Sequence, residues 1–260
     1  MNAEGYQTVN ARTRAPRFRV ALAGSEAELR AAQRLRYDVF VDELGGDGPL
    51  VDHDARLERD RFDPFFDHLL LHDDAAGHVV GVYRIMGQEA AARAGQFYSE
   101  DEYDLAPLHA SGRRLLELGR SCLHKDYRGG AGMMHLWSAL AAYVAERQID
   151  ILFGTASFHG TDTGALAAPL SLLHHRHLAP EALRVRARSG TAMDLMPEDQ
   201  IDRRAAMRAV PSLIKAYLRL GGTVGEGAFI DHAFNTTDVC LVMDIAALNV
   251  RQRAIYAKAP

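Results

Sequence analysis

The first candidates for catalytic or binding residues lie in a short acidic segment, Glu58-Arg59-Asp60-Arg61-Phe62-Asp63. An acidic run on its own is usually a solvated loop. Here other charged residues, each near an apolar run, could share a site with its three carboxylates: Arg36, Arg84, Glu117 and Arg120. Carboxylates bind ammonium groups, and guanidiniums bind carboxylates through paired hydrogen bonds. The set therefore suits a ligand that carries both an amine and a carboxylate.

The elements that must position these groups follow from the spacing of apolar residues. Short apolar runs between turn residues predict strands, at residues 18–23, 68–72, 79–86, 114–123, 150–155 and 238–245. Apolar residues spaced three and four apart predict helices, at residues 25–44, 132–144, 165–173 and 206–220, with a short helix at the end of the chain. Ser25 and Glu28 form a capping box for the first helix, and Pro169 interrupts the third. This order predicts an α/β fold with a mixed central sheet flanked by helices.

The bulk composition limits the class of protein. With 260 residues and 48% hydrophobic content, the chain can form one large domain, predicted over residues 17–260 after a flexible arm at 1–16. A net charge of −4 argues against a nucleic-acid binder. No apolar run approaches the ~20 residues that span a bilayer, and the polar N-terminus is not a secretory signal. Cys122 and Cys240 lie in apolar runs, where buried free thiols are expected, as in a cytoplasmic protein.

A glycine-rich turn, Arg128-Gly129-Gly130-Ala131-Gly132, lies between the predicted strand at 114–123 and the helix after it. Backbone N–H groups at the start of a helix favour an anion. The turn is not G-x-G-x-x-G, and no Gly-Lys-Ser/Thr follows, so a dinucleotide or a nucleoside triphosphate is poorly supported. Two interpretations stay open: a clasp for the phosphate of a pantetheine arm, or a tight turn alone.

With its strand and helix, this turn resembles the acyl-CoA-binding segment of the GNAT acyltransferase superfamily. That pattern is Arg/Gln-x-x-Gly-x-Gly/Ala, and here Ala131 stands at the first of its glycines. A second resemblance is to acyl-homoserine-lactone synthases, which are GNAT-like enzymes that take acyl groups from acyl carrier protein. It rests on residues across the first half of the chain: Arg36, Phe40, Glu58-x-Asp60-x-x-Asp63, Arg84 and Glu117-x-x-Arg120.

The second half of the chain resembles the ornithine-lipid N-acyltransferases. The residues that carry this resemblance are the runs 156–162 (ASFHGTD), 217–222 (YLRLGG), 231–232 (DH) and 234–238 (FNTTD). The resemblance implies a GNAT-like fold and transfer of a 3-hydroxyacyl group from acyl carrier protein to the α-amine of ornithine, giving lyso-ornithine lipid. Closely similar enzymes use glutamine. The other interpretations are an acyl-homoserine-lactone synthase and a catalytically silent module that binds acyl carrier protein or lipid.

The resemblance also implies roles for single residues. Glu117 is expected to be the general base or to orient the amine, with Glu58 as the alternative base, and Arg120 to support Glu117 or bind the substrate carboxylate. In a regular strand, residues three apart point to opposite faces. Glu117 and Arg120 can therefore share a site only if a bulge forms near Gly119.

The remaining residues are expected to bind the two substrates. Substrate-binding roles fall to Arg36, Phe40, Asp60, Asp63 and Arg84, with His159 and Asp162 as a second site or, alternatively, a helix cap. The N–H groups of two residues are expected to polarise the thioester and three further residues to line the pantetheine phosphate: Leu123 and His124, then Arg128, Gly130 and Gly132. Arg36 and Arg84 could instead form structural salt bridges with the acidic segment.

Partners and cofactors follow from the same reaction. Acyl carrier protein is acidic, so the alternating Arg184, Arg186 and Arg188, predicted as an exposed basic strand and extended by Arg203, Arg204 and Arg208, could steer its docking. A lipid product implies a possible peripheral contact with the inner membrane surface. No cofactor beyond the phosphopantetheine of the carrier is expected, and the spacing of His174-His175-Arg176-His177 suits no tetrahedral metal site.

Overall fold

One eight-stranded sheet organises the computed structural model, which describes residues 15–188 and 190–248. Its strands run in the order β1 (Phe18–Leu22), β2 (Asp67–Asp73), β3 (His78–Gly87), β5 (Leu115–Leu123), β6 (Ile151–His159), β10 (Thr236–Asp244) and β8 (Thr223–Val224), and β9 (Phe229–Asp231) also pairs with β10. All neighbours are antiparallel except β5 and β6. The predicted mixed sheet is therefore confirmed. A separate pair, β4 (Tyr103–Asp104) and β7 (Arg186–Ala187), stands beside it.

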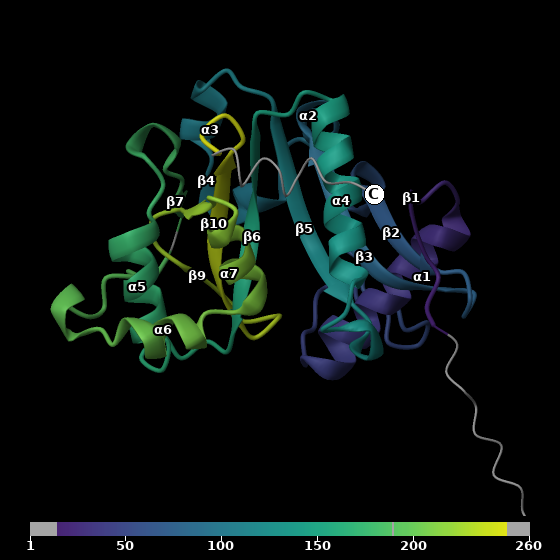
Figure 1. The fold of residues 1–260 in the computed structure, drawn as a ribbon, viewed down its shortest axis with the longest axis horizontal. Helices are drawn as coiled ribbons and strands as arrows, with labels where there is room; N and C mark the ends of the chain where they lie inside the picture. The colour runs from purple at the N-terminus through teal and green to yellow at the C-terminus, as the bar shows by residue number, and fades with distance from the viewer. Residues whose placement is uncertain (1–14, 189, 249–260) are drawn as a thin grey trace, which may run out of the picture.

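Helices cover both faces of this sheet because successive residues of each strand point to opposite sides. In β2, Leu71 packs in the same cluster as Leu136 of α4 (Gly132–Glu146), whereas its neighbour Leu70 packs with Ala32 and Leu35 of α1 (Glu26–Arg36). Figure 1 shows α4 lying across the sheet face nearer the viewer. The near-continuous apolar run of β2 is the sequence signal of a strand that is buried on both faces.

The predicted first helix is confirmed, with a change of winding. The Ser25 hydroxyl accepts the N–H of Glu28 at 3.2 Å, which satisfies one of the free donors at the helix start. After α1 the chain continues as a wider π-helical turn, η1 (Tyr37–Glu43), and ends before Gly45, whose φ of +73° is readily adopted only by glycine. The first helix thus carries the chain into the irregular region that holds the acidic segment.

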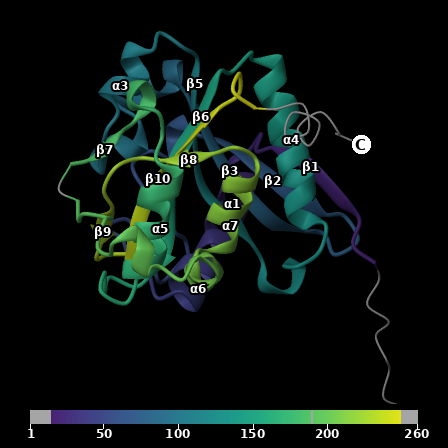
Figure 2. The same ribbon diagram turned by 60° about the vertical axis from the view of Figure 1, so that its left-hand side comes forward.

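Two other helix predictions were wrong in detail, both because of proline. The predicted helix 206–220 is two helices, α6 (Arg203–Ala209) and α7 (Ser212–Arg219), since Pro211 disfavours helical geometry at Val210 and lacks the N–H that a continuous helix would use. Pro169 does not interrupt its helix. It lies in the first turn of α5 (Ala167–His177), where no N–H is needed. Figure 2 shows α5 and α6 packed beside each other.

Short elements fill the remaining connections. The segment between β3 and β5 holds α2 (Gln88–Ala94), the 3-10 helix η3 (Tyr98–Asp101), β4 and α3 (Ala106–Ala110). Further 3-10 turns are η2 (Asp63–Phe65), η4 (Lys125–Tyr127), η5 (Glu181–Leu183) and η6 (Glu198–Gln200). The basic strand predicted around Arg184–Arg188 is reduced to the two residues of β7, because its partner strand β4 is equally short and the other side has a single bridge, to Glu226.

Three sequence-based expectations concern the core and the ends of the chain. Cys122 and Cys240 are free and buried, as predicted. The arm predicted at 1–16 lies outside the described residues up to residue 14, and the predicted final helix lies mostly outside them. None of the helices in the described ranges has the length and the apolar content to cross a bilayer.

The parallel strands β5 and β6 stay together over only three residues. Their pairing runs from Leu115 with Ile151 to Glu117 with Phe153 and then stops. Beyond this point the strands diverge, toward the lower edge of Figure 1. The sheet therefore opens into a wedge between β5 and β6, next to the residues predicted as catalytic.

Candidate active site

Arg36 is the centre of a buried ion network. Its side chain is 0% exposed. It donates from Nε to Glu58 Oε2 at 2.5 Å, and from Nη1 and Nη2 to the two oxygens of Asp63, each at 2.8 Å. A further bond reaches the backbone oxygen of Glu58 at 2.6 Å. Each nitrogen of this guanidinium thus has a protein partner, which makes Arg36 a structural residue.

Arg84 completes the network from β3. Its Nη1 donates to Asp60 Oδ2 and Asp63 Oδ1, both at 2.7 Å, and its guanidinium lies 4.2 Å from the ring centre of Phe66. Burial by itself would raise the pKa of Glu58, Asp60 and Asp63, but the neighbouring arginines outweigh it and hold all three pKa values below their ordinary range. The predicted acids and arginines do converge. They pair mainly with one another, so the arginines already neutralise Asp60 and Asp63, and these two acids are poorly placed to bind a substrate amine.

The bulge expected near Gly119 is present, at Arg120. This residue has a φ of +49°, and the register between β3 and β5 shifts between Val82 and Arg84. The bulge turns Arg120 toward the same segment that Glu117 contacts: Glu117 accepts the N–H of Tyr98, and Arg120 Nη1 donates to the Tyr98 hydroxyl at 3.3 Å. Glu117 and Arg120 therefore share a site, as the strand geometry alone would not allow.

The Glu117 carboxylate is held by three donors. It accepts the N–H of Tyr98 at 2.8 Å, the N–H of Ser99 at 2.6 Å and the Ser99 hydroxyl at 2.5 Å. Burial raises its pKa to about 7, although the bonds from Ser99 act in the opposite direction. Such a pKa suits a general base, but Glu117 does not line either cavity beside Arg120. Its contacts fix the segment that carries Tyr98.

Arg120 lies between two cavities of about 220 and 260 Å³. Its Nε donates to Glu58 Oε1 at 3.2 Å, and its guanidinium lies 5.0 Å from the ring centre of Tyr98 and 4.8 Å from that of Phe234. With a side chain that is 14% exposed, it is the arginine of the network that borders both cavities. The larger cavity is also lined by Glu58 and Asp60, and the smaller by Phe40 and Asp238.

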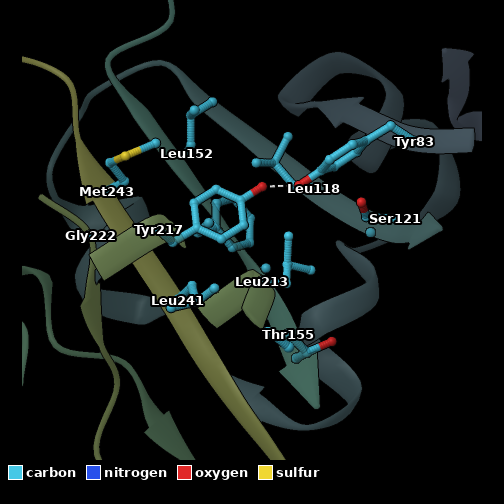
Figure 3. Close-up of a pocket in the computed structure, with 14 residues that line it drawn as sticks. Tyr83, Leu118, Ser121, Leu152, Thr155, Leu213, Tyr217, Gly222, Leu241 and Met243 are labelled. Atoms are coloured by element: carbon cyan, nitrogen blue, oxygen red, sulfur yellow. Dashed lines mark hydrogen bonds between the residues drawn. The ribbon is translucent and has the colours of Figure 1, made fainter. Parts of the chain in front are cut away.

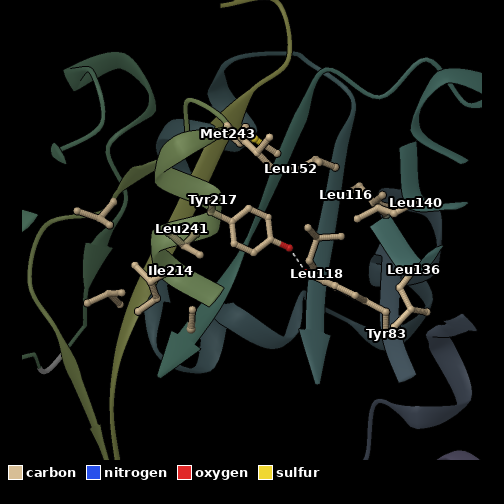
Figure 4. Close-up of a cluster of buried hydrophobic side chains, with 14 of the residues drawn as sticks. Tyr83, Leu116, Leu118, Leu136, Leu140, Leu152, Ile214, Tyr217, Leu241 and Met243 are labelled. Atoms are coloured by element: carbon tan, nitrogen blue, oxygen red, sulfur yellow. Dashed lines mark hydrogen bonds between the residues drawn. The ribbon is translucent and has the colours of Figure 1, made fainter. Parts of the chain in front are cut away.

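The wedge between β5 and β6 holds a third, narrow cavity of about 40 Å³. Leu118 and Gly154 line it from the two strands, and Leu213 and Tyr217 line it from α7. Figure 3 shows the Tyr217 ring reaching across the wedge, where its hydroxyl hydrogen-bonds the Tyr83 hydroxyl. In Figure 4 the same pair lies among the buried leucines of the main core. The wedge is thus an apolar slot closed by two tyrosines.

The glycine-rich turn leads into a helix, α4, as predicted, but one of the two N–H groups expected to polarise the thioester is already used. The N–H of His124 donates to Val80 O at 2.9 Å, so it is used within the sheet. Alternation along an antiparallel ladder turns the N–H of Leu123 to the opposite edge of β5, toward the wedge. Arg128 donates to Leu123 O and to both oxygens of Glu43. Gly132 begins α4, and no side chain caps this helix start, so its first N–H groups have no side-chain acceptor.

Two predicted regions lie apart from this group. Asp162 is exposed and accepts the N–H groups of Gly164 and Ala165, which caps the turn before α5 and not a helix; the helix cap of the alternative interpretation is absent, because α5 starts after Leu166 without a side-chain cap. His159 is exposed at the end of β6 and lines neither cavity beside Arg120. Within the described ranges, no cluster of His, Cys, Asp and Glu has the arrangement of a metal site.

The arginines predicted to form a basic docking face are partly neutralised. Arg184 and Arg186 both pair with Glu181, at 2.8 and 2.6 Å, and Arg186 also pairs with Glu226 at 3.0 Å. Arg188 donates to the backbone oxygen of Glu100. The net positive charge of this surface is therefore smaller than the sequence pattern suggests.

His68 is buried beside Asp63 of the ion network, and we expect its imidazole to make the free energy of unfolding depend on pH. Burial, followed by repulsion from Arg36, lowers its pKa to about 4, and its Nε2 lies 3.1 Å from Asp63 O. An unfolded histidine takes up its proton near pH 6.5, so between pH 6.5 and 4 the unfolded state binds more protons and stability falls as the pH falls. We expect a loss of up to about 3 kcal/mol over this window. Urea unfolding at several pH values should show a flatter dependence for His68→Gln; an identical slope would contradict this assignment.

Comparison with known proteins places this geometry in a class. Residues 35–138 match the family model described as an acetyltransferase (GNAT) domain. The fold resembles FeeM, an N-acyl amino acid synthase from uncultured soil microbes, with a TM-score of 0.52 at 13% identity over 90% of this chain and 93% of that one. It also resembles the CoA-dependent acyl-homoserine lactone synthase BjaI, with a TM-score of 0.50 at 14% identity over 89% and 81%. The protein is an N-acyltransferase with a GNAT fold.

Sequence similarity then identifies the family. The chain is 58% identical over 246 residues to the L-ornithine N(alpha)-acyltransferase of Rhodobacter capsulatus, covering 93% of this chain and 95% of that protein. It belongs to the L-ornithine N(alpha)-acyltransferase family. The resemblance found in the sequence is confirmed.

Proposed function

We propose that this protein transfers a 3-hydroxyacyl group from acyl carrier protein to the α-amine of ornithine, giving lyso-ornithine lipid. The observation that carries the proposal is the parting of β5 and β6 beside the Arg120 cavities, in a chain 58% identical to an enzyme named for that acceptor. A thioester on a long arm needs a slot between strands, and an amino acid needs a charged cavity at its end.

The acyl donor enters the wedge. The phosphate of its pantetheine meets the uncapped N–H groups at the start of α4, and the Leu123 N–H faces the thioester oxygen as charge develops there. The acyl chain lies among the apolar side chains of the wedge, such as Leu118 and Leu213. A cavity of about 40 Å³ is too small for it, so Tyr217 must move away from Tyr83 when the donor binds.

The amino acid lies in the cavity on the Phe40 side of Arg120. Arg120 binds its α-carboxylate, because Arg36 and Arg84 are committed to Glu58, Asp60 and Asp63 and lie deeper in the protein. Glu117 positions the substrate indirectly, by fixing the Tyr98 segment that supports Arg120. No covalent intermediate is needed, and burial raises the pKa of Cys122 to about 12, which leaves its thiol protonated and unreactive.

Acyl carrier protein docks near α7, which lines the wedge, and α6, the helix that precedes α7 in the chain. Arg204 and Arg208 are exposed on α6, where they can meet the acidic carrier, whereas the exposed Arg203 already pairs with Glu198 at 3.4 Å. The phosphopantetheine arm brings the only prosthetic group that the reaction uses, and a peripheral contact with the inner membrane surface would receive the lipid product.

The test is an assay with purified protein, 3-hydroxyacyl-acyl carrier protein or the matching CoA thioester, and ornithine, glutamine or S-adenosylmethionine. We expect thiol release and the mass of lyso-ornithine lipid, with the carrier-bound donor preferred. A glutamine lipid or a lactone as the main product would overturn the proposal, and no thiol release with any amine would support a silent binding module.

A further inference from the structure

The cavity of about 220 Å³ has an acidic wall of its own, separate from the paired acids Glu58 and Asp60 that line the larger cavity. Asp231 and Asp238 line it, and Glu102 lies close enough to both to affect their ionisation. Asp238 and Glu102 are each 4% exposed, yet Asp238 Oδ1 and Glu102 Oε2 have no hydrogen-bond partner among the described residues. In the same ranges, no salt bridge reaches any of the three acids. Buried carboxylate oxygens without donors are unusual and need an explanation.

The strand register explains why two of these acids face one space. Asp231 of β9 lies opposite Thr236 of β10, and Thr236 and Asp238, two residues apart, point to the same side of the sheet. Burial, with Asp231 also repelling, raises the pKa of Asp238 to about 6 even though the hydroxyl groups of Ser157 and Thr236 lower it, and burial with repulsion from Asp238 and Asp231 raises the pKa of Glu102. Carboxylates that repel one another at the wall of a cavity are stabilised when a cation binds there.

Arg120 borders the same cavity and lowers the pKa of both Asp238 and Glu102, but among the described residues it forms no salt bridge with either acid, and its hydrogen bonds go to Glu58 and Tyr98. The cavity therefore has a guanidinium that can bind a substrate carboxylate and, separately, acids that can bind a substrate cation. On the basis of the proposed function, we infer that Asp238 binds the side-chain ammonium of the acceptor, with Glu102 and Asp231 in support. This contact selects a diamino acid over glutamine. The amide of glutamine can donate hydrogen bonds but brings no charge to balance these acids.

The experiment compares two acceptors that differ only in that ammonium: ornithine and L-2-aminopentanoate, which has the same carbon chain without the terminal amine. For Asp238→Asn, a variant of the same shape, kcat/KM for ornithine should fall at least about tenfold while the value for L-2-aminopentanoate stays within about twofold. Glu102→Gln should shift the ratio in the same direction. Asp194→Asn, which removes an exposed carboxylate elsewhere, should leave the ratio unchanged.

Calorimetric binding of ornithine, alongside thermal unfolding, provides a readout that is independent of turnover. Loss of ornithine affinity in folded Asp238→Asn supports the assignment. An equal fall for both acceptors, or no fall for ornithine, overturns it, and if Asp238→Asn does not fold, Glu102→Gln decides by the same criteria. Failure of the proposed function looks different: the wild-type enzyme itself would not acylate ornithine.

Discussion

An Arg36→Met variant is expected to lose about 3–5 kcal/mol of its free energy of unfolding, which can be measured by urea denaturation. Methionine fills much of the same volume, but it leaves Glu58 and Asp63 buried without the guanidinium that binds both. The neighbouring Arg84 already binds Asp60 and Asp63, and the Glu58 carboxylate would keep a single bond, from Arg120 Nε at 3.2 Å. Since domains are stable by about 5–15 kcal/mol, this loss is large enough to reduce the folded population at 37 °C.

The matched control is Arg56→Met. Arg56 also joins two carboxylates, Asp38 and Asp42, but its side chain is 51% exposed. Water can solvate these surface acids once the arginine is removed, so the unfolding midpoint should barely change. If Arg36→Met were as stable as Arg56→Met, the buried network would not be the structural support described above.

The fold was predictable where the apolar pattern is long. The first helix, the hairpin of β2 and β3 and the central strands follow from periodicity over seven or more residues. Elements as short as β8 and β9 carry no such pattern, and they form only because β10 offers them a long edge. The break at Pro211 had a sequence signal, the proline itself, which outweighs the apolar stripe that continues through it.

The sequence predicted which charged residues would meet in the site, but not which acid would pair with which arginine. Spacing and residue type indicate that acids and arginines meet, whereas which carboxylate is left without a cation depends on distances that the sequence does not contain. Asp238 belongs to a run that the family resemblance had marked, yet its supporting acid Glu102 comes from a connection with no regular pattern. Tyr98 was missed for the same reason, although it contacts Arg120.

The wedge itself depends on one glycine, and Gly154→Ala is expected to lose about 2–4 kcal/mol of stability. Gly154 follows the last residue of β6 that pairs with β5, and its φ is +156°. A Cβ there would lie 2.1 Å from the backbone oxygen of Leu118, which no rotamer change can relieve. The strands must therefore move apart at the point where the wedge begins, and the apparent KM for the acyl donor should rise as well.

Gly119→Ala is the matched control for Gly154→Ala. Gly119 lines the same cavity from β5, but a Cβ at that position meets nothing within 4 Å. Urea unfolding should therefore separate the two variants by at least about 2 kcal/mol, because only one alanine forces backbone atoms apart. If they proved equally stable, the junction of β5 and β6 would have enough freedom to absorb a methyl group. The wedge would then owe its shape to the packing of α7 and not to the close approach of the two strands.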